Sequence, residues 1–523
     1  PPAGLAAMSS RQRTIAFIVM TIGMFMASLD IQIVTSSVRE IQAGLAATAD
    51  EVALVQTSYL IAEVIMIPLS GWLSRMASTR WLFTASAAGF TLASIGCGLA
   101  WNLESMIAFR AIQGFVGGAM IPTVFAAGFA MFPGPAQTRI PAVLGLVATL
   151  APALGPTIGG WITQTWSWRW LFFINIVPGL LILAVVPRLV RIDEPDLGLL
   201  RRFDAVGALL LAVFLGTLQY TLDEGPRRQW LEDPLLQVLA PVSAAAGVLF
   251  VWRSLGGAEP LVELRAFRHR NFALGCALSF AIGVGLYGSI YLTPVFLGQV
   301  RGQNALDIGT TVFAVGLANI AATPVTVALL RRVSLRTLLL VGFALFVVSS
   351  LMFTRIDASW SRAEVMLPQV LRGVATMVCI IPVTGLALGA LAADEVKGGS
   401  GLYNLMRNLG GAIGLAVINS QLFYDRLHFH AQRLEAELGA GLATVQARAD
   451  ALAPLLQRMT TDDDRATRAL LALISRLGQR EALTLSFVDV FTMLALFFVA
   501  PLLLACLIDG RRPAAAASTA DSH

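Results

Sequence analysis

The stretch LAPALGPTIGG, at Leu150–Gly160, is the most informative part of this sequence. It lies inside an apolar run that is long enough to cross a bilayer, yet it carries Pro152, Gly155, Pro156, Gly159 and Gly160. Proline removes a backbone donor and clashes with the preceding turn, so the two prolines are expected to bend the helix. The glycines take side chains away from one face and let a neighbouring helix approach closely. The stretch therefore predicts a kinked membrane helix in a tight seam between moving parts.

Apolar segments make up most of the chain. Of its 523 residues, 56% are hydrophobic and only 13% are charged, whereas a soluble domain carries roughly a quarter charged residues. Apolar runs of about 20 residues, each enough to cross the bilayer core, recur along almost the whole length. We therefore predict an all-α polytopic membrane protein. No cleavage site follows the first apolar run, Ile15–Leu29, so we expect no cleavable signal peptide.

Basic residues sort by side of the membrane. Apolar windows and their charged flanks predict fourteen spans, and an even number puts both termini on one side. With the N-terminus inside, nineteen Lys and Arg residues fall in cytoplasmic segments and seven in short outer loops. This bias predicts cytoplasmic termini. It also accounts for the net charge of +5 without a nucleic-acid partner.

Cysteine and histidine provide no cluster that would favour an enzyme or a metal site. All four cysteines fall inside apolar segments and are interpreted as packing residues: Cys97, Cys276, Cys379 and Cys506. The four histidines are His269, His428, His430 and His523. We therefore expect no catalytic residue, no metal and no cofactor, although a membrane-embedded enzyme or a sensor stays an alternative. A nucleotide-binding loop of the GxxxxGK[ST] type is absent from the sequence, which disfavours an ATP-driven pump.

One outer segment is much longer than the others. Residues Tyr424–Thr484 are rich in Ala, Leu, Arg, Glu and Gln, and their leucines recur at helical spacing. This pattern predicts a helical hairpin outside the membrane. The hairpin is either a solvated flap or a docking surface for an extracytoplasmic protein, and the sequence does not choose between them.

Ionisable residues inside the spans are the main functional candidates, because each costs about 2.5–3.5 kcal/mol to insert. Asp30 ends the apolar run of span 1, Glu63 lies within span 2, and Arg110 lies in span 4. One interpretation is a structural ion pair of Asp30 with Arg110. The other is a proton-coupling site, in which burial raises the pKa of a carboxylate and a nearby arginine lowers it. Proton coupling is the interpretation we favour.

Other polar residues in the spans are candidates for the wall of a substrate cavity. They are Gln56, Tyr59, Gln113, Arg372, Asn404 and Arg407. Gln56 and Tyr59 share a helix face with Glu63, at i−7 and i−4. The two C-terminal arginines can instead serve helix packing or a gate, and Asp489 at the start of span 14 can simply be hydrated.

Several motifs together resemble those of the major facilitator superfamily, in particular the fourteen-span drug:proton antiporters of the EmrB/QacA type. LAPALGPTIGG resembles the antiporter motif of the fifth span. FRAIQGFVGGAMIP at Phe109–Pro122 resembles the span 4 motif, and GWLSRMASTRWLF at Gly71–Phe83 stands where the cytoplasmic loop motif belongs. Further similar segments are Ser167–Leu180, Phe203–Leu211 and Leu261–Phe272. The resemblance covers nearly the whole chain.

The resemblance implies a major facilitator fold with alternating access. Residues 1–190 would form an N-terminal six-helix bundle, and residues 191–255 an inserted hairpin of spans 7 and 8. Residues 256–510 would form the C-terminal bundle, with the periplasmic hairpin at 424–484, and residues 511–523 a cytoplasmic tail. In the loop motif, the gate residues would be Gly71, Arg75 and Arg80. Many relatives have an acidic residue in that loop where this chain has Ser74 and Arg75, although the EmrB branch tends to have a basic one, so an acidic gate residue cannot be transferred from that motif.

The function implied is proton-driven multidrug efflux from the bacterial inner membrane. Lipophilic or amphipathic small molecules would be exported and the proton gradient would supply the energy. A periplasmic membrane-fusion adaptor and an outer-membrane channel would be the partners in a tripartite pump. The alternative is a dedicated exporter of one endogenous compound, such as a fatty acid, a siderophore or a secondary metabolite.

Overall fold

The computed structural model describes residues 8–508, apart from residues 36, 133, 257–259, 304, 393–394 and 441–462. Within these ranges the regular structure is helical throughout. Thirteen of the described helical segments are long and apolar enough to cross a membrane. The predicted all-α membrane protein is confirmed. The predicted tail at residues 511–523 lies outside the described residues.

Spans 1 to 6 come from the first part of the chain, together with one short helix that connects the first two spans. They are α2 (Ser10–Thr35), α3 (Val38–Gly44), α4 (Ala49–Ala77), α5 (Thr79–Gly98), α6 (Leu103–Gly117), α7 (Met120–Met131), α8 (Ile140–Thr165), α9 (Trp170–Phe173) and α10 (Ile176–Leu189). Helices α6 and α7 form one interrupted span, as do α9 and α10. Capping boxes fix the starts of two of these helices: Thr48 with Glu51 before α4, and Asn102 with Ser105 before α6.

Two further helices form a hairpin that packs on α4. They are α11 (Ala205–Glu224) and α12 (Pro234–Gly256). At its base, the side chain of Asp204 caps α11 and accepts hydrogen bonds from Arg253 at 2.9 Å. Because the Arg253 guanidinium donates to it, the pKa of the Asp204 carboxyl is held below its ordinary value.

The remaining spans come from the last part of the chain. They are α13 (Arg270–Val295) with the π-helix η5 (Phe296–Val300), α14 (Ala305–Leu330), α15 (Leu335–Phe353), α16 (Arg362–Leu388), α17 (Val396–Ser420) and α20 (Asp463–Ala505). The π-helix η6 (Gln421–Asp425) and α18 (Arg426–Ala440) follow α17 directly.

The predicted count of fourteen spans is only roughly supported, because α17 is not among the thirteen apolar segments. It carries Lys397, Arg407 and three asparagines, which lower its hydropathy. It is nevertheless 25 residues long and packs between α13 and α4. Its position inside the bundle explains why it can be polar, since it faces other helices instead of lipid.

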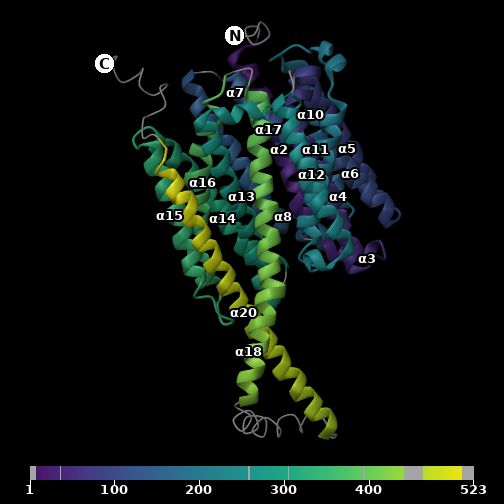
Figure 1. Cartoon of the computed structure of the whole chain (residues 1–523), viewed down its shortest axis with the longest axis vertical. Helices are drawn as coiled ribbons and strands as arrows, with labels where there is room; N and C mark the ends of the chain where they lie inside the picture. Colours follow the sequence, from purple (N-terminus) through teal and green to yellow (C-terminus); the bar gives the residue numbers. More distant parts are fainter. Residues whose placement is uncertain are drawn as a thin grey trace.

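Figure 1 shows two groups of helices with α8 and α17 between them. On one side lie α4, α5, α6, α10, α11 and α12, and on the other side lie α13, α14, α15 and α16. Helix α8 packs on α2, which precedes α4 in the chain, and on α14 and α16 of the other group. Helix α17 packs on α4 of the one group and on α13 of the other. These two helices therefore carry much of the contact between the halves.

Helices α18 and α20 extend beyond one end of the bundle and pack against each other (Figure 1). The start of α2 and the end of α20 lie at the opposite end of the molecule, which we call the terminal end. The helical hairpin predicted over Tyr424–Thr484 thus includes α18 and the first part of α20. Residues 441–462 between them lie outside the described residues.

The opening motif lies at the junction of the two halves, as its composition predicts. A Cβ on Gly155 would overlap Gln32 of α2, and a Cβ on Gly145 would lie 2.8 Å from Ile380 of α16. On the other side of α8, the nearest atom to a Cβ on Gly309 of α14 is Thr157 Oγ1, at 2.7 Å. Glycine at these points allows α8 to approach α2, α14 and α16 closely.

Candidate functional site

Arg110 is at the centre of a buried polar network in the first half of the molecule. The glycine-rich face of α6 brings it there, because a Cβ on Gly114 would overlap the carbonyl of Tyr59, and one on Gly118 would lie 2.6 Å from that of Glu63. The two glycines therefore allow α6 to lie directly against α4. The Arg110 side chain is fully buried as a result.

The guanidinium of Arg110 joins residues from three helices. Its Nη1 donates to Asp30 Oδ2 of α2 at 2.5 Å and to Gln113 Oε1 at 2.8 Å. Its Nη2 donates to Gln56 Oε1 at 3.3 Å, and its Nε donates to the Val55 carbonyl at 3.2 Å. The structure thus places an ion pair between Asp30 and Arg110 in the interior, with Gln56 and Gln113 around it.

The second oxygen of Asp30 has its own donors. Asp30 Oδ1 accepts from Gln113 Nε2 at 3.1 Å and from Asn175 Nδ2 at 2.9 Å. Both amides also donate to the hydroxyl of Ser94, at 2.7 and 3.1 Å respectively. A buried ion pair is stable only when its remaining hydrogen-bonding capacity is satisfied, and these residues satisfy it. Sequence reasoning missed Asn175 and Ser94; an asparagine in the apolar run FFINIV was the available signal.

An aromatic ring, that of Tyr59, packs against the guanidinium of Arg110. The ring of Tyr59 lies 4.2 Å from the Arg110 guanidinium carbon, at the distance of a cation–π contact. Tyr59 is itself fully buried, and its hydroxyl has no hydrogen-bond partner. Five of the predicted residues, Asp30, Gln56, Tyr59, Arg110 and Gln113, are therefore brought together.

Glu63 lies one helical turn beyond Tyr59 and differs from Asp30 in having no partner. It is buried at 3% exposure, and its carboxylate has no ion pair or hydrogen bond with any residue that the structure describes. Electrostatic interactions nevertheless link it to Arg110 in its own half and to Arg407 of α17 in the other half. Glu63 is thus a buried carboxylate without an ion-pair partner in the described part of the chain.

Arg407 is only partly satisfied. Its Nη2 donates to Asn404 Oδ1 one turn earlier on α17, while its Nη1 is buried without a hydrogen-bond partner. The rings of Phe125 and Tyr403 lie 5.5 and 5.9 Å from its guanidinium carbon. The structure therefore pairs two of the predicted cavity residues, Asn404 and Arg407, on the face of α17 that meets the first half.

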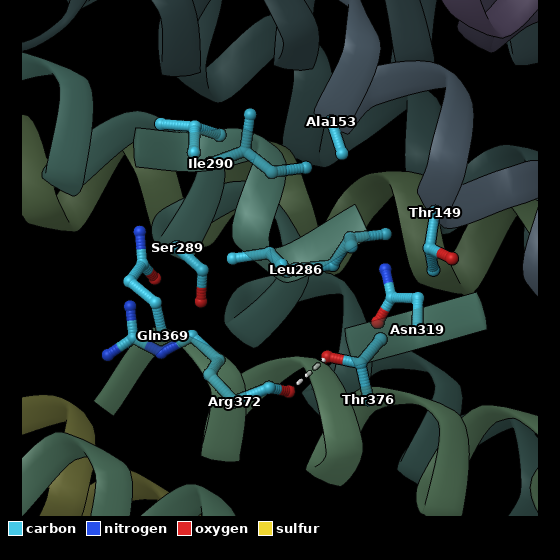
Figure 2. Close-up of a pocket in the computed structure, with 11 residues that line it drawn as sticks. Thr149, Ala153, Leu286, Ser289, Ile290, Asn319, Gln369, Arg372 and Thr376 are labelled. Atoms are coloured by element: carbon cyan, nitrogen blue, oxygen red, sulfur yellow. Dashed lines mark hydrogen bonds between the residues drawn. The ribbon is translucent and has the colours of Figure 1, made fainter. Parts of the chain in front are cut away.

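Arg372 lies apart from this network, at a small cavity between the halves. The cavity has a volume of about 20 Å³ and is lined by α8, α13, α14 and α16 (Figure 2). Such a volume holds about one water molecule, whereas drug-sized ligands occupy about 300–1,000 Å³. A drug-sized cargo does not fit this cavity unless the two halves separate.

Ion pairs close the terminal end of the junction. Lys397, at the start of α17, pairs with Asp193 after α10, and Arg75 of the loop motif pairs with Glu263 before α13. Asp193 also accepts from the Thr79 backbone N–H, at 3.1 and 3.0 Å from its two oxygens. The loop motif itself has no acidic residue at this position, and Asp193 and Glu263, which lie in two linkers distant in sequence, provide the carboxylates here. Any movement that separates the halves at this end must break both ion pairs.

The other predicted gate residues have different surroundings. A Cβ on Gly71 would lie 2.8 Å from the backbone of Gly398, so glycine permits close contact between α4 and α17 here. Arg80 instead lies over the ring of Trp81, at 5.0 Å. Gly71 and Arg75 therefore lie at the junction, whereas Arg80 faces its neighbour on α5.

Asp489 is paired at the opposite end. It accepts from His430 Nε2 at 2.9 Å and lies 3.6 Å from Arg426 Nε, so it ties α18 to α20. The sequence suggested a hydrated residue. Its side chain is indeed partly exposed, but it is also hydrogen-bonded.

The arrangement of two helical halves around buried charges agrees with a comparison of the sequence. The family model described as "Major Facilitator Superfamily" matches residues 20–415. The chain belongs to the major facilitator superfamily. It is therefore a multi-pass membrane transporter and not an enzyme.

Curated members of the superfamily cover most of the chain. It is 40% identical to the "Colistin resistance protein EmrB" of Acinetobacter baumannii over 94% of this chain and 96% of that protein. It is 30% identical to the "Fatty acid resistance protein FarB" of Neisseria gonorrhoeae, over 82% and 85% of the two chains. The "Multidrug export protein EmrB" of Escherichia coli K12 is 29% identical, over 81% and 83%. The predicted family is confirmed.

Solved structures of the superfamily share the fold. The human organic anion transporter MFSD10 matches with a TM-score of 0.56 and 14% identity, over 95% of this chain and all of that one. The proton:xylose symporter XylE matches with a TM-score of 0.57 and 14% identity, over 94% and 96% of the two chains. The predicted major facilitator fold is confirmed by these matches.

Proposed function

We propose that this transporter exports lipophilic or amphipathic small molecules across the bacterial inner membrane in exchange for protons. The observation that carries the proposal is a pair of buried carboxylates in the first half. Asp30 is paired with Arg110, and Glu63 has no ion pair with a described residue but interacts electrostatically with Arg110 and Arg407. Carboxylates inside a membrane are costly and mark proton and substrate pathways. The multidrug-export relatives support the direction of transport and the class of cargo.

The geometry suggests how protons and cargo are coupled. Arg407 belongs to one half and Glu63 to the other, so movement of the halves changes the distance between them. Approach of the cation favours the charged carboxylate, and separation favours the protonated form. Proton binding and the opening of the cavity are then linked through one equilibrium between conformations.

The proton-coupling residues can be tested with two isosteric variants, Asp30→Asn and Glu63→Gln. Neither variant can exchange a proton at the substituted carboxyl, so each is expected to lower proton-driven uptake of a fluorescent lipophilic drug at least about tenfold, corresponding to about 1.4 kcal/mol. Uptake is measured in everted vesicles with an imposed pH gradient, together with proton release on addition of drug. Glu104→Gln, at an exposed site in the first turn of α6, is the matched control and should transport like the wild type.

Transport by both variants at the wild-type rate, with an unchanged requirement for the pH gradient, would show that these carboxylates do not couple protons. No uptake by the wild type of any compound in a panel of lipophilic cations, acids and neutral drugs would count against multidrug export itself.

A second candidate is export of one endogenous acidic compound. Two observations favour it: a relative named for fatty acid resistance and a cation, Arg372, at the cavity between the halves. The same vesicles distinguish the two, since a dedicated exporter would take up fatty acids but not chemically unrelated drugs.

We further propose that both termini are cytoplasmic and that the α18–α20 pair meets a periplasmic adaptor linked to an outer-membrane channel. The arginine bias supports the orientation, and the projection of this pair beyond the bundle supports contact with an external protein (Figure 1).

The adaptor contact predicts that deleting residues 424–484 separates two activities. Replacing this segment with a short flexible linker should preserve uptake in everted vesicles, because Asp30 and Arg110 lie in the other half. It should abolish drug resistance of intact cells that contain the adaptor and channel. Retained resistance would contradict the docking role, and pull-down of the adaptor by the full chain but not by the deletion variant is the direct measurement.

A further inference from the structure

Arg372 of α16 is a buried cation without a counter-ion. It is 2% exposed, and both Nη1 and Nη2 lack a hydrogen-bond partner. It forms no ion pair with any residue in the described ranges. Arg110 and Arg407 differ in this respect, because each donates to at least one side chain.

Aromatic rings stabilise the guanidinium but leave its N–H groups unused. The ring of Phe353 lies 4.6 Å from the guanidinium carbon and that of Phe491 lies 5.4 Å away. The two rings stack on each other with their centroids 4.5 Å apart. Such contacts favour a cation over the ring face, but the buried N–H donors at the edge of the guanidinium still require acceptors.

Two amide side chains at the same cavity are also incompletely satisfied. Gln369 Oε1 and Asn319 Oδ1 are buried without partners, and both residues are 1% exposed. The hydroxyls of Ser289 and Thr149 already donate to carbonyls of their own helices. In Figure 2, Gln369 and Ser289 lie beside Arg372, while Asn319 and Thr149 line the opposite side.

We propose that Arg372 and Gln369 form a binding site for one small monovalent anion at this cavity. The anion would accept hydrogen bonds from Nη1 and Nη2 of Arg372, which have no acceptor among the described residues. The two ends of an amide have nearly the same shape, so Gln369, which lies beside Arg372 (Figure 2), can turn its NH₂ group toward the anion. The volume of about 20 Å³ restricts the ligand to a halide or a single carboxylate group.

A bound water explains the same site less well. A water can bridge the guanidinium and an amide, but it leaves a full positive charge in the interior. A buried charge is stable when it is both paired and hydrogen-bonded, and an anion provides both. The source of the anion is either free chloride or the acid group of a cargo, and the second case rests on the proposed export function.

Anion binding predicts a specific change in thermal stability. The purified transporter in detergent is exchanged into sodium sulfate, whose anion is divalent and larger than a halide, and its unfolding midpoint is measured while chloride, bromide or octanoate is added. A ligand that binds only the folded protein raises the midpoint as its concentration rises. Octanol, which has the same chain but no charge, is the control for octanoate.

Variants assign the effect to Arg372. Arg372→Gln should weaken the anion response at least about tenfold, as expected for loss of charged hydrogen bonds, whereas Arg372→Lys should retain part of it. Arg336→Gln, at an exposed site near the start of α15, is the matched control and should respond like the wild type. Crystals soaked in bromide provide a readout independent of variant folding, with anomalous density expected beside the guanidinium.

The outcomes separate the two sources from each other and from the proposed function. A response to halides but not to octanoate identifies a resident ion, and a response to octanoate that chloride competes away identifies the acid group of a cargo. Equal midpoints in chloride, octanoate and sulfate, together with no bromide density, would overturn the site and leave water as its occupant. None of these measurements requires transport, so failure of export would leave the result intact.

Discussion

Arg110→Met is expected to lower the free energy of unfolding by about 3–5 kcal/mol, the cost of leaving one partner of a buried ion pair uncompensated. Asp30 would retain the donors Gln113 and Asn175 but would lose its cation. The variant also removes the donors to Gln56 and to the Val55 carbonyl. Thermal unfolding in detergent and the amount of monodisperse protein in membranes measure the loss.

The double variant Arg110→Met with Asp30→Asn isolates the charge effect. Because it removes both charges, it should recover a large part of the lost stability, although the loss of Asp30 still impairs transport. Together with the wild type and both single variants, it completes a double-mutant cycle that gives the coupling energy of the pair. Arg110→Lys keeps the charge but cannot reproduce the fixed guanidinium donors, so an intermediate stability is expected. Wild-type stability in the Arg110→Met protein would show that the pair contributes nothing to the fold.

Gly155→Leu is expected to abolish transport, because the new side chain would occupy the contact between α8 and α2. Even a Cβ at this position would overlap Gln32, and it would approach the backbone nitrogen of Ile33 to 3.3 Å. Overpacking of this kind costs about 1–3 kcal/mol or more. The displaced segment of α2 includes Asp30, two residues from Gln32, so the ion pair with Arg110 would be disturbed as well.

Gly316→Ala is the matched control for this substitution. A Cβ at Gly316 of α14 would lie 3.4 Å from Leu150 and 3.6 Å from Ala153 of the same motif helix, which is near ordinary packing distance. This variant should remain folded and active. Fluorescence-detected gel filtration and vesicle uptake are compared for both proteins. Normal uptake by the Gly155→Leu variant would mean that close packing of α8 on α2 is not required for transport.

Much of the fold could be predicted from local sequence. Apolar runs predicted the spans because crossing the bilayer is a property of each segment by itself. The span at α17 was among the fourteen predicted, although it is not one of the thirteen strongly apolar segments; its charges and asparagines are tolerated because it packs on α4 and α13. The seam position of LAPALGPTIGG could be predicted as well, since small residues on a helix face indicate close helix packing.

The site was only partly predictable. Intramembrane charges identified Asp30, Glu63 and Arg110 because each has a high insertion cost. Asn175 and Ser94 were not predicted, because a neutral polar residue in an apolar run has a lower insertion free energy than a charged one and does not by itself indicate a functional site. Asp193 and Glu263 resembled ordinary charges in solvated linkers, and only folding brings them against Lys397 and Arg75.

The sequence by itself determined that the chain is a helical membrane transporter of the major facilitator superfamily, with its closely packed helix at Leu150–Gly160. The tertiary structure decided which charges meet. Asp30 is paired with Arg110, while Glu63 and Arg372 have no ion pair with any residue that the structure describes. The physical reason is that hydropathy and helix-face composition are set by neighbouring residues, whereas the partner of a charge is set by the packing of helices that are far apart in sequence. Both sources of information were needed for LAPALGPTIGG. Its composition predicts close packing, and the fold shows that its helix packs against α2, α14 and α16.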